Sequence, residues 1–169
     1  RFCTSKSSFT NQFKKTKIMP VGVDIVASSA LRTPRSILFL GRIAPSKHPE
    51  VLIDALRLLA KEKTVFTASI YGSPLPKDDA FARALKKQAE ELLSVSFHDS
   101  IPNRETPDIY AAHEIYVNLS ASGMYDKTLF EAAAAGCWAP RRSRCSSSRA
   151  LSAAWAGGGL FVPPAAAVV

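Results

Sequence analysis

The chain has 169 residues, enough for one domain with a hydrophobic core, and a formal net charge of +8. The charge is uneven, because residues 1–35 hold seven Lys or Arg against one acid, residues 137–169 hold four against none, and residues 36–136 hold eleven against thirteen. Since a nucleic-acid-binding domain usually carries its basic residues on the folded core, the nearly neutral centre argues against nucleic acid as a partner.

The predicted elements begin after residue 35. Residues 1–35 are rich in Lys, Ser and Thr, and we expect the tail of a preceding domain and a linker there. Short apolar runs predict strands, and longer amphipathic runs predict helices. The expected strands are 36–42, 65–71, 95–98 and 115–119, and the expected helices are 49–61, 78–93, a short one opening near Pro107, and 128–135.

The strict alternation of these runs predicts an α/β domain over residues 36–169 with a doubly wound, parallel, Rossmann-like sheet. Ligands of such sheets bind beyond the carboxyl ends of the strands. Residues 137–156 are an atypical part of this domain, because an Arg- and Ser-rich run stands where the alternation requires another strand.

Two cations follow the first strand. Arg42 comes directly after Gly41, and Lys47 precedes the helix that we expect to begin at Pro49. A helix N-terminus favours an anion, Arg can donate a bidentate pair to phosphate, and Lys acts as a point charge. The pair therefore indicates a phosphate site, while two solvated loop residues remain the alternative.

A second candidate is the polar loop that runs from Ser120 into an Ala-rich helix. Glu131 lies one turn into that helix, where a carboxylate could accept both hydroxyls of a ribose. The alternative is an acid that merely complements the positive end of the helix dipole.

In order and spacing, these motifs resemble the C-terminal half of glycosyltransferase family 4, which has the GT-B fold. The resemblance rests on Gly41-Arg42 with Lys47, on Gly72, and above all on the run from Leu129 to Gly136, LFEAAAAG. It covers about residues 17–136 and resumes at Gly159. Because it resumes at the usual separation, we favour a locally altered reading frame over a divergent insert for residues 137–156.

The resemblance implies roles for individual residues. It assigns the donor's diphosphate to Arg42 and Lys47, and the ribose to Glu131. The family's sugar-facing Glu, eight positions earlier, is replaced here by Gly123. We expect Asp126 as a substitute carboxylate, with solvated loop charge as the alternative.

The following residues extend the expected donor site. Lys127 is a candidate extra cation for phosphate, with a solvated loop charge as the alternative, and the backbone N–H groups near Lys127 and Thr128 are expected to stabilise the departing diphosphate.

The predicted function is a donor-binding domain that transfers a sugar from a nucleotide diphosphate sugar to a glycan, lipid or small-molecule acceptor. A GT-B enzyme also needs an N-terminal domain, so we expect the fragment alone to be inactive. The alternatives are a catalytically silent nucleotide-binding module and a basic nucleic-acid-associated α/β domain. We expect no cofactor, since the nucleotide sugar is a substrate, and no metal, since the chain has no D-x-D pair and no Cys and His set with zinc spacing.

A cytoplasmic location is also expected, either free or peripheral to a membrane. The uncharged stretch 150–169 is interrupted by Gly157-Gly158-Gly159 and Pro163-Pro164, which argues against a spanning helix.

Overall fold

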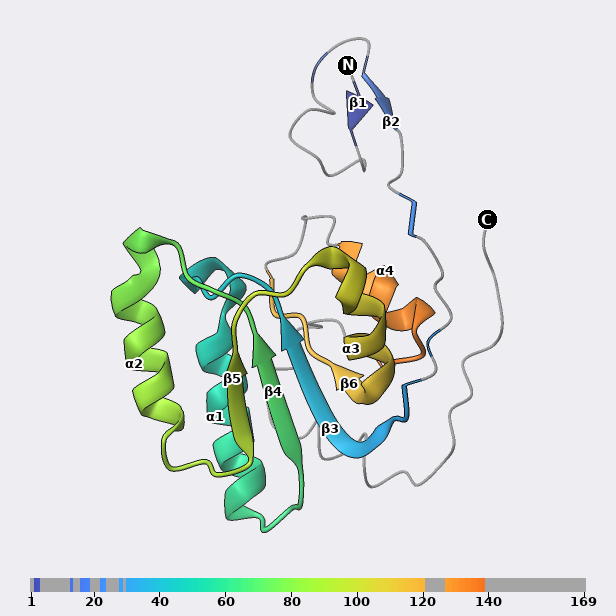
Figure 1. The fold of residues 1–169 in the computed structure, drawn as a ribbon. Coiled ribbons are helices and arrows are strands. Elements are labelled where there is room, and N and C mark those ends of the chain that lie inside the picture. Colours follow the sequence, from blue (N-terminus) through green and yellow to red (C-terminus); the bar gives the residue numbers. More distant parts are fainter. Residues whose placement is uncertain are drawn as a thin grey trace.

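The computed structural model describes residues 30–120 and 127–138, together with residues 2–3, 13, 16–18, 22–23 and 28. A four-stranded parallel sheet lies at the centre of this part of the chain (Figure 1). Its strands, in chain order, are β3 (Thr33–Leu40), β4 (Thr67–Tyr71), β5 (Val95–His98) and β6 (His113–Tyr116). A separate parallel pair joins β1 (Phe2–Cys3) to β2 (Lys17–Ile18).

Helices connect the strands of the sheet. They are α1 (Pro49–Lys61), α2 (Asp79–Ala89), α3 (Thr106–Ala112) and α4 (Lys127–Ala134). Short 3-10 turns precede three of them, namely η2 (Pro45–Lys47), η3 (Pro76–Asp78) and η4 (Asn103–Glu105).

The strand order is β5-β4-β3-β6, and every neighbouring pair is parallel. The chain therefore runs outward from β3 to β5 and then returns to the other side of β3. This reversal confirms the predicted doubly wound sheet and places its topological switch point between β3 and β6.

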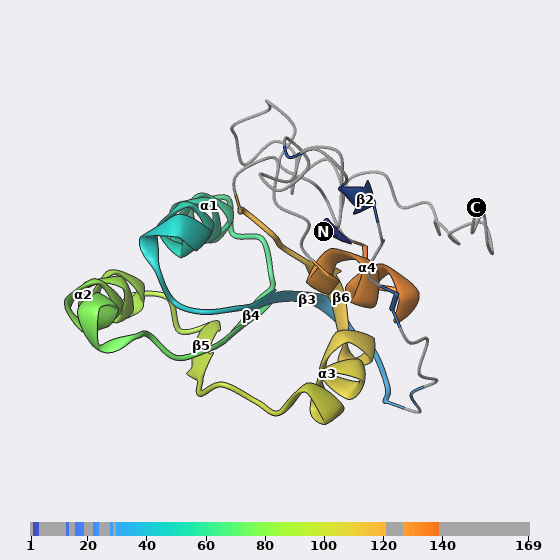
Figure 2. The ribbon, with the colours of Figure 1, turned by 90° about the horizontal axis from the view of Figure 1, so that it is seen from above.

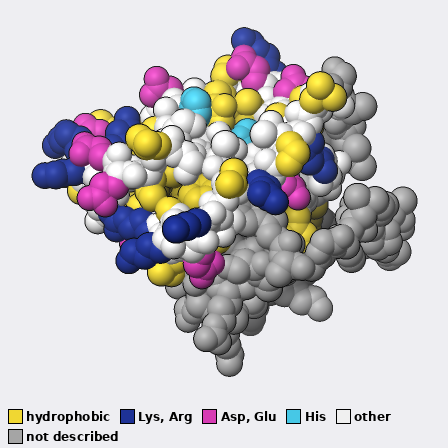
Figure 3. Space-filling model, turned by 90° about the horizontal axis from the view of Figure 1, so that it is seen from below, with side chains coloured by type: hydrophobic (Ala, Val, Ile, Leu, Met, Phe, Trp, Pro, Cys, Tyr) yellow, Lys and Arg dark blue, Asp and Glu magenta, His cyan; other side chains and the backbone are white. Residues whose placement is uncertain are grey.

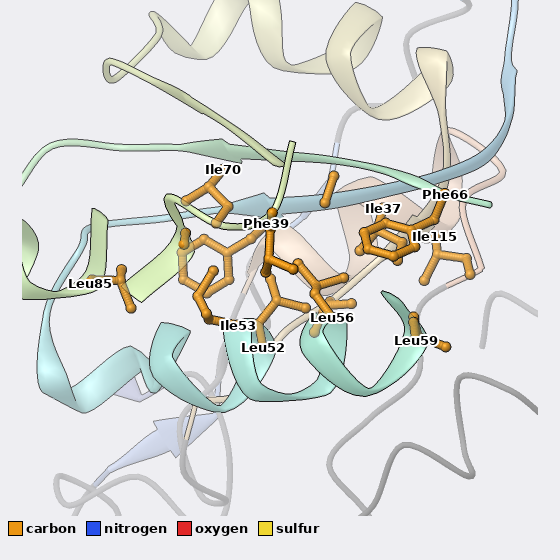
Figure 4. Close-up of a cluster of buried hydrophobic side chains, with 14 of the residues drawn as sticks. Ile37, Phe39, Leu52, Ile53, Leu56, Leu59, Phe66, Ile70, Leu85 and Ile115 are labelled. Atoms are coloured by element: carbon orange, nitrogen blue, oxygen red, sulfur yellow. The ribbon is translucent and has the colours of Figure 1, made fainter. Parts of the chain in front are cut away.

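The larger core fills the space between the sheet and α1. Figure 2 shows α1 and α2 on one side of the strands and α3 on the other. Figure 4 shows the buried side chains of this core, which come from α1, α2 and the strands. Fully burying one Leu or Ile contributes roughly 1.5–3 kcal/mol, so this cluster is the main support of the fold.

Helix α1 has the bounds that the sequence predicts, with Pro49 in its first turn. Its buried face differs in detail. The helical spacing of the apolar residues predicts Val51 and Leu58 on the core side, but they are 45% and 42% exposed, whereas Ile53 is fully buried. The buried stripe is centred on Leu52 and Leu56, one position around the helix, because that face meets the sheet.

The opposite face of the sheet carries a smaller cluster under α3 and α4. It consists of Leu38, Tyr110, Tyr116, Ala132 and Cys137. The Cys137 thiol donates to the Tyr110 carbonyl oxygen at 2.8 Å, and burial raises its pKa to about 11. This thiol is therefore a packing group rather than a nucleophile.

Two strands begin earlier than predicted. Strand β3 starts at Thr33 rather than Ser36, and β6 starts at His113 rather than Ile115. The cause is tertiary, since Thr33 and His113 pair with each other across the sheet.

Helix α2 ends earlier than predicted, at Ala89 rather than near Leu93. The chain turns there, because the Leu92 amide donates to the Ala89 carbonyl oxygen at 2.9 Å. The turn buries Leu92 and leaves Leu93 fully exposed.

The first residues of the predicted atypical segment lie beside β6. The Trp138 amide donates to the Glu114 carbonyl oxygen, and the Tyr116 amide donates to the Trp138 carbonyl oxygen, both at 2.9 Å. Trp138 thus forms a parallel bridge with Ile115, where the alternation expects another strand. Residues 139–156 lie outside the described residues, and their reading frame stays a hypothesis. The expected tail of a preceding domain and linker over residues 1–35 also stays a prediction, although Thr33, Pro34 and Arg35 belong to β3.

The surface of the described residues shows the mixed charge that the nearly neutral centre of the sequence predicts. In Figure 3, Lys and Arg side chains are interspersed with Asp and Glu over the described part of that face. None of the helices that the structure describes is both long and apolar enough to cross a membrane.

Candidate functional site

The candidate site lies at the carboxyl ends of β3 and β6, where the sheet reverses its order. A pocket opens there, and its non-protein space of about 170 Å³ is continuous with solvent. It is lined by Phe39, Leu40, Lys47, Tyr116, Val117, Asn118, Leu119 and Ser120. This hollow is a shallow, open depression rather than an enclosed ligand-sized pocket, and the charged side chain in its lining is Lys47.

The two predicted cations take different positions at this edge. Arg42 follows β3, is exposed, and has no hydrogen-bond or ion-pair partner within the described part of the chain. Lys47 ends η2 and lines the pocket, and its Nζ donates to Ser120 Oγ at 2.9 Å. The loops after β3 and β6 therefore meet through Lys47.

The N-terminus of α1 already holds an acid of its own. His48 caps the helix with φ of 52°, and its Nδ1 lies 3.1 Å from Glu50 Oε1. Glu50 stands in the first turn, where it complements the helix dipole. Lys47, rather than the end of α1, is thus the positive feature that faces the pocket.

Glu131 lies on α4 with both carboxylate oxygens near partners. Its Oε1 is 3.0 Å from Lys127 Nζ, and its Oε2 is 3.5 Å from the Tyr110 hydroxyl. The side chain is 23% exposed, so it stays accessible to a ligand. Lys127 and Glu131 thus place a cation and a carboxylate on the same face of α4.

Thr128 joins α4 to the end of β6. The Tyr116 hydroxyl donates to Thr128 Oγ1 at 2.6 Å, and Asn118 Nδ2 donates to the same oxygen at 3.4 Å. Asn118 Oδ1 accepts the Ser120 amide at 2.9 Å. Three of the residues that line the pocket, Tyr116, Asn118 and Ser120, therefore form one hydrogen-bonded group with Thr128.

Sequence reasoning missed Tyr116 and Asn118. Tyr116 lies within an apolar strand pattern, and Asn118 belongs to the run Asn118-Leu119-Ser120, a glycosylation sequon whose simplest interpretation is chance occurrence. The one usable signal was a polar Asn next to an apolar strand at the predicted carboxyl edge. Both side chains are buried, at 1% and 7% exposure.

The remaining predicted site residues, Gly123 and Asp126, lie outside the described residues. Among the residues that are described, no group of three or more His, Cys, Asp or Glu side chains could hold a metal ion.

Comparisons with known proteins bear on the family and the fold of the chain. A family model described as glycosyl transferases group 1 matches residues 34–139. The UDP-N-acetylglucosamine–peptide N-acetylglucosaminyltransferase GtfA subunit of Streptococcus pneumoniae serotype 4 is 31% identical over 134 residues, which are 77% of this chain and 25% of that protein.

Two solved structures show the same fold. The pneumococcal O-GlcNAc transferase GtfA, in complex with UDP and GlcNAc, matches with a TM-score of 0.62 at 28% identity, over 76% of this chain and 25% of that one. The C-terminal domain of a glycosyl transferase group 1 family protein, LpcC, from Francisella tularensis matches with a TM-score of 0.57 at 20% identity, over 75% and 76% of the two chains. The second likeness concerns the fold alone.

The chain spans about a quarter or less of the length of the curated relatives that it matches.

Proposed function

The chain belongs to the glycosyl transferases group 1 family, and from this we propose that its carboxyl-edge site binds the nucleoside diphosphate part of a sugar donor. The observation that carries the proposal is Lys47, which lines the pocket at the switch point and contacts Ser120 from the opposite loop. An anion in this pocket would lie between the loops after β3 and β6.

Three cations are assigned to the negatively charged diphosphate. Lys47 supplies a point charge inside the pocket, and the exposed Arg42 is available for a bidentate contact. Lys127 adds a third charge from the first turn of α4. Fixed positive charge at this place would stabilise the leaving diphosphate as the bond to the sugar breaks.

Glu131 is proposed as the ribose contact. A carboxylate accepts hydrogen bonds from two neighbouring hydroxyls, and Glu131 is both accessible and held by Lys127. For the sugar itself we propose Asp126 as the carboxylate in place of the family's Glu, because Gly123 occupies that position.

A uridine diphosphate sugar is the proposed donor class. The support is the pneumococcal relative, whose structure holds UDP and GlcNAc. The acceptor is left as a glycan, a lipid or a small molecule.

Sugar transfer itself also needs a bound acceptor and a domain that holds it. Donor and acceptor must be held together in reacting geometry, and the match covers only a quarter of the pneumococcal enzyme. We therefore propose that these 169 residues bind the donor without transferring its sugar, and that an N-terminal domain completes the enzyme.

Titration calorimetry with UDP tests the donor site. Replacing Lys47 or Arg42 by Ala should each weaken binding, with roughly 10- to 150-fold expected for a charge-assisted contact worth about 1.5–3 kcal/mol. The exposed Arg83 on α2 offers a matched control, since Arg83→Ala removes the same charge away from the site. Unchanged affinity in both Lys47→Ala and Arg42→Ala would remove the diphosphate assignment.

Nucleotide release, measured with and without candidate acceptors, tests whether the 169-residue chain binds the donor without transferring its sugar. Acceptor-dependent turnover by the 169-residue chain would contradict the half-enzyme proposal. If a longer chain that includes the acceptor domain also shows no acceptor-dependent release, the catalytically silent nucleotide-binding module is favoured. That outcome would be consistent with the loss of the family's Glu at Gly123.

A further inference from the structure

The end of β6 holds a buried phenol in a polar contact. Tyr116 is 1% exposed, and its hydroxyl lies 2.6 Å from Thr128 Oγ1 and 3.4 Å from the Leu40 carbonyl oxygen. A buried hydroxyl that loses its partner costs free energy, so this contact fixes where Thr128 lies. The shorter distance identifies Thr128 as the stronger partner.

Asn118 extends the contact to the opposite loop. Its amide group donates to Thr128 Oγ1, and its carbonyl oxygen accepts the Ser120 amide. Ser120 Oγ in turn accepts from Lys47 Nζ. An unbroken chain of hydrogen bonds thus runs from Tyr116 through Thr128, Asn118 and Ser120 to Lys47.

A second tyrosine lies beside the first. The rings of Tyr110 and Tyr116 meet edge to face, with centroids 5.4 Å apart and an interplanar angle of 87°. The Tyr110 hydroxyl is 3.5 Å from Glu131 Oε2. Since Thr128 and Glu131 are three residues apart on α4, the two tyrosines contact the same face of the helix.

We propose that Tyr116 and Asn118 are positioning residues that clamp the Thr128 hydroxyl and so hold α4 in place relative to Lys47. The clamp sets the separation between Lys47, on the β3 side, and Lys127 and Glu131, on the α4 side. This inference rests on the proposed function, because the separation matters only if one ligand bridges both sides.

Three substitutions distinguish the proposed positioning role from a role in which Tyr116 and Thr128 only pack α4 against the sheet. Thr128→Ser keeps the hydroxyl, Thr128→Val keeps the shape without it, and Tyr116→Phe removes only the phenolic oxygen. If the clamp positions the site, Thr128→Val and Tyr116→Phe should each weaken UDP binding about tenfold, while Thr128→Ser stays within about threefold of the parent chain. The double variant Tyr116→Phe, Thr128→Val should lose little more than either single one, since both remove the same contact.

The affinities are measured by calorimetry at a temperature where every variant is fully folded. Thr67→Val is the matched control, because Thr67 is exposed at the amino end of β4, on the opposite edge of the sheet. Variants that melt earlier but bind UDP as tightly as the parent chain would overturn the positioning role.

Hydrogen exchange of the α4 amides separates this inference from the proposed function. Faster exchange in Thr128→Val but not in Thr128→Ser supports the clamp, even if the parent chain fails to bind UDP and the donor proposal falls. Equal exchange in both variants would overturn the clamp, whatever the chain binds.

Discussion

Replacing Glu131 by Gln separates a ligand contact from a helix-stabilising role. The substitution keeps the size of the side chain and removes its charge. In the structure the carboxylate faces Lys127 at 3.0 Å, with side-chain exposures of 45% for Lys127 and 23% for Glu131. A partly exposed pair four residues apart contributes about 0.3–0.5 kcal/mol, and Lys before Glu is the less favourable order. The stability of the chain should therefore fall by less than about 1 kcal/mol.

The expected loss of affinity is larger. A carboxylate that accepts ribose hydroxyls makes charge-assisted hydrogen bonds worth about 1.5–3 kcal/mol, which is roughly 10- to 150-fold in Kd. Glu131→Gln should thus weaken UDP binding far more than it lowers the melting temperature.

Calorimetry and thermal melting of the same samples provide the assay. Glu91→Gln, at an exposed acid after α2, is the control for a change of net charge. A Glu131→Gln variant that loses stability while binding UDP as before would refute the ribose contact and leave Glu131 as a helix-dipole partner.

Three further predictions concern the scaffold, and all are read by thermal or urea unfolding. Arg32 donates to the Ala135 carbonyl oxygen at 2.9 Å and to the Ala111 carbonyl oxygen at 3.4 Å, so Arg32→Ala should lower the free energy of unfolding by about 1 kcal/mol. Arg32→Lys should recover only part of that loss, because Lys lacks the guanidinium group that reaches both oxygens. An Arg32→Ala chain as stable as the parent would contradict this prediction. Partial burial lowers the pKa of His113, so its contribution to the free energy of unfolding should be fully present above the usual value of about 6.5 and should be lost as the pH falls below it. His113→Gln should therefore flatten the dependence of stability on pH just below that value, and an unchanged slope would refute the assignment. A Cβ at Gly72, whose φ is +149°, would lie 1.9 Å from the Gly41 carbonyl oxygen, whereas a Cβ at Gly41 meets nothing within 4 Å. Gly72→Ala should therefore lower the free energy of unfolding by about 1–3 kcal/mol or more, and Gly41→Ala should lower it far less. Equal losses in the two variants would contradict the geometry.

Much of the fold followed from local patterns. Helix α1 was predicted with its observed ends because Pro49 marks its first turn and its apolar residues recur at helical spacing. Strand β5 also has its predicted bounds, 95–98. The start of β3 was missed, since Pro34 and Arg35 look like loop residues and only the pairing of Thr33 with His113 makes them part of a strand.

The candidate site was predicted in part. Arg42 and Lys47 were expected from their residue type and their position after the first strand, and Glu131 from its place one turn into a predicted helix. Their contacts with a ligand stay predictions. The contact between Lys47 and Ser120 joins residues 73 positions apart, and nothing local in the sequence encodes it. For the same reason the roles of Tyr116 and Asn118 became visible only once α4 lay against β6.

The central claim is that a nucleoside diphosphate binds at the carboxyl ends of β3 and β6. The most direct measurement is the change in backbone amide NMR shifts as UDP is added to the isotope-labelled chain. We predict saturable shifts at Gly41, Lys47 and Ser120, with no change at Thr67 or Ser94, which lie at the amino ends of β4 and β5. Shifts confined to the amino edge, or no saturable shifts at millimolar UDP, would contradict the claim.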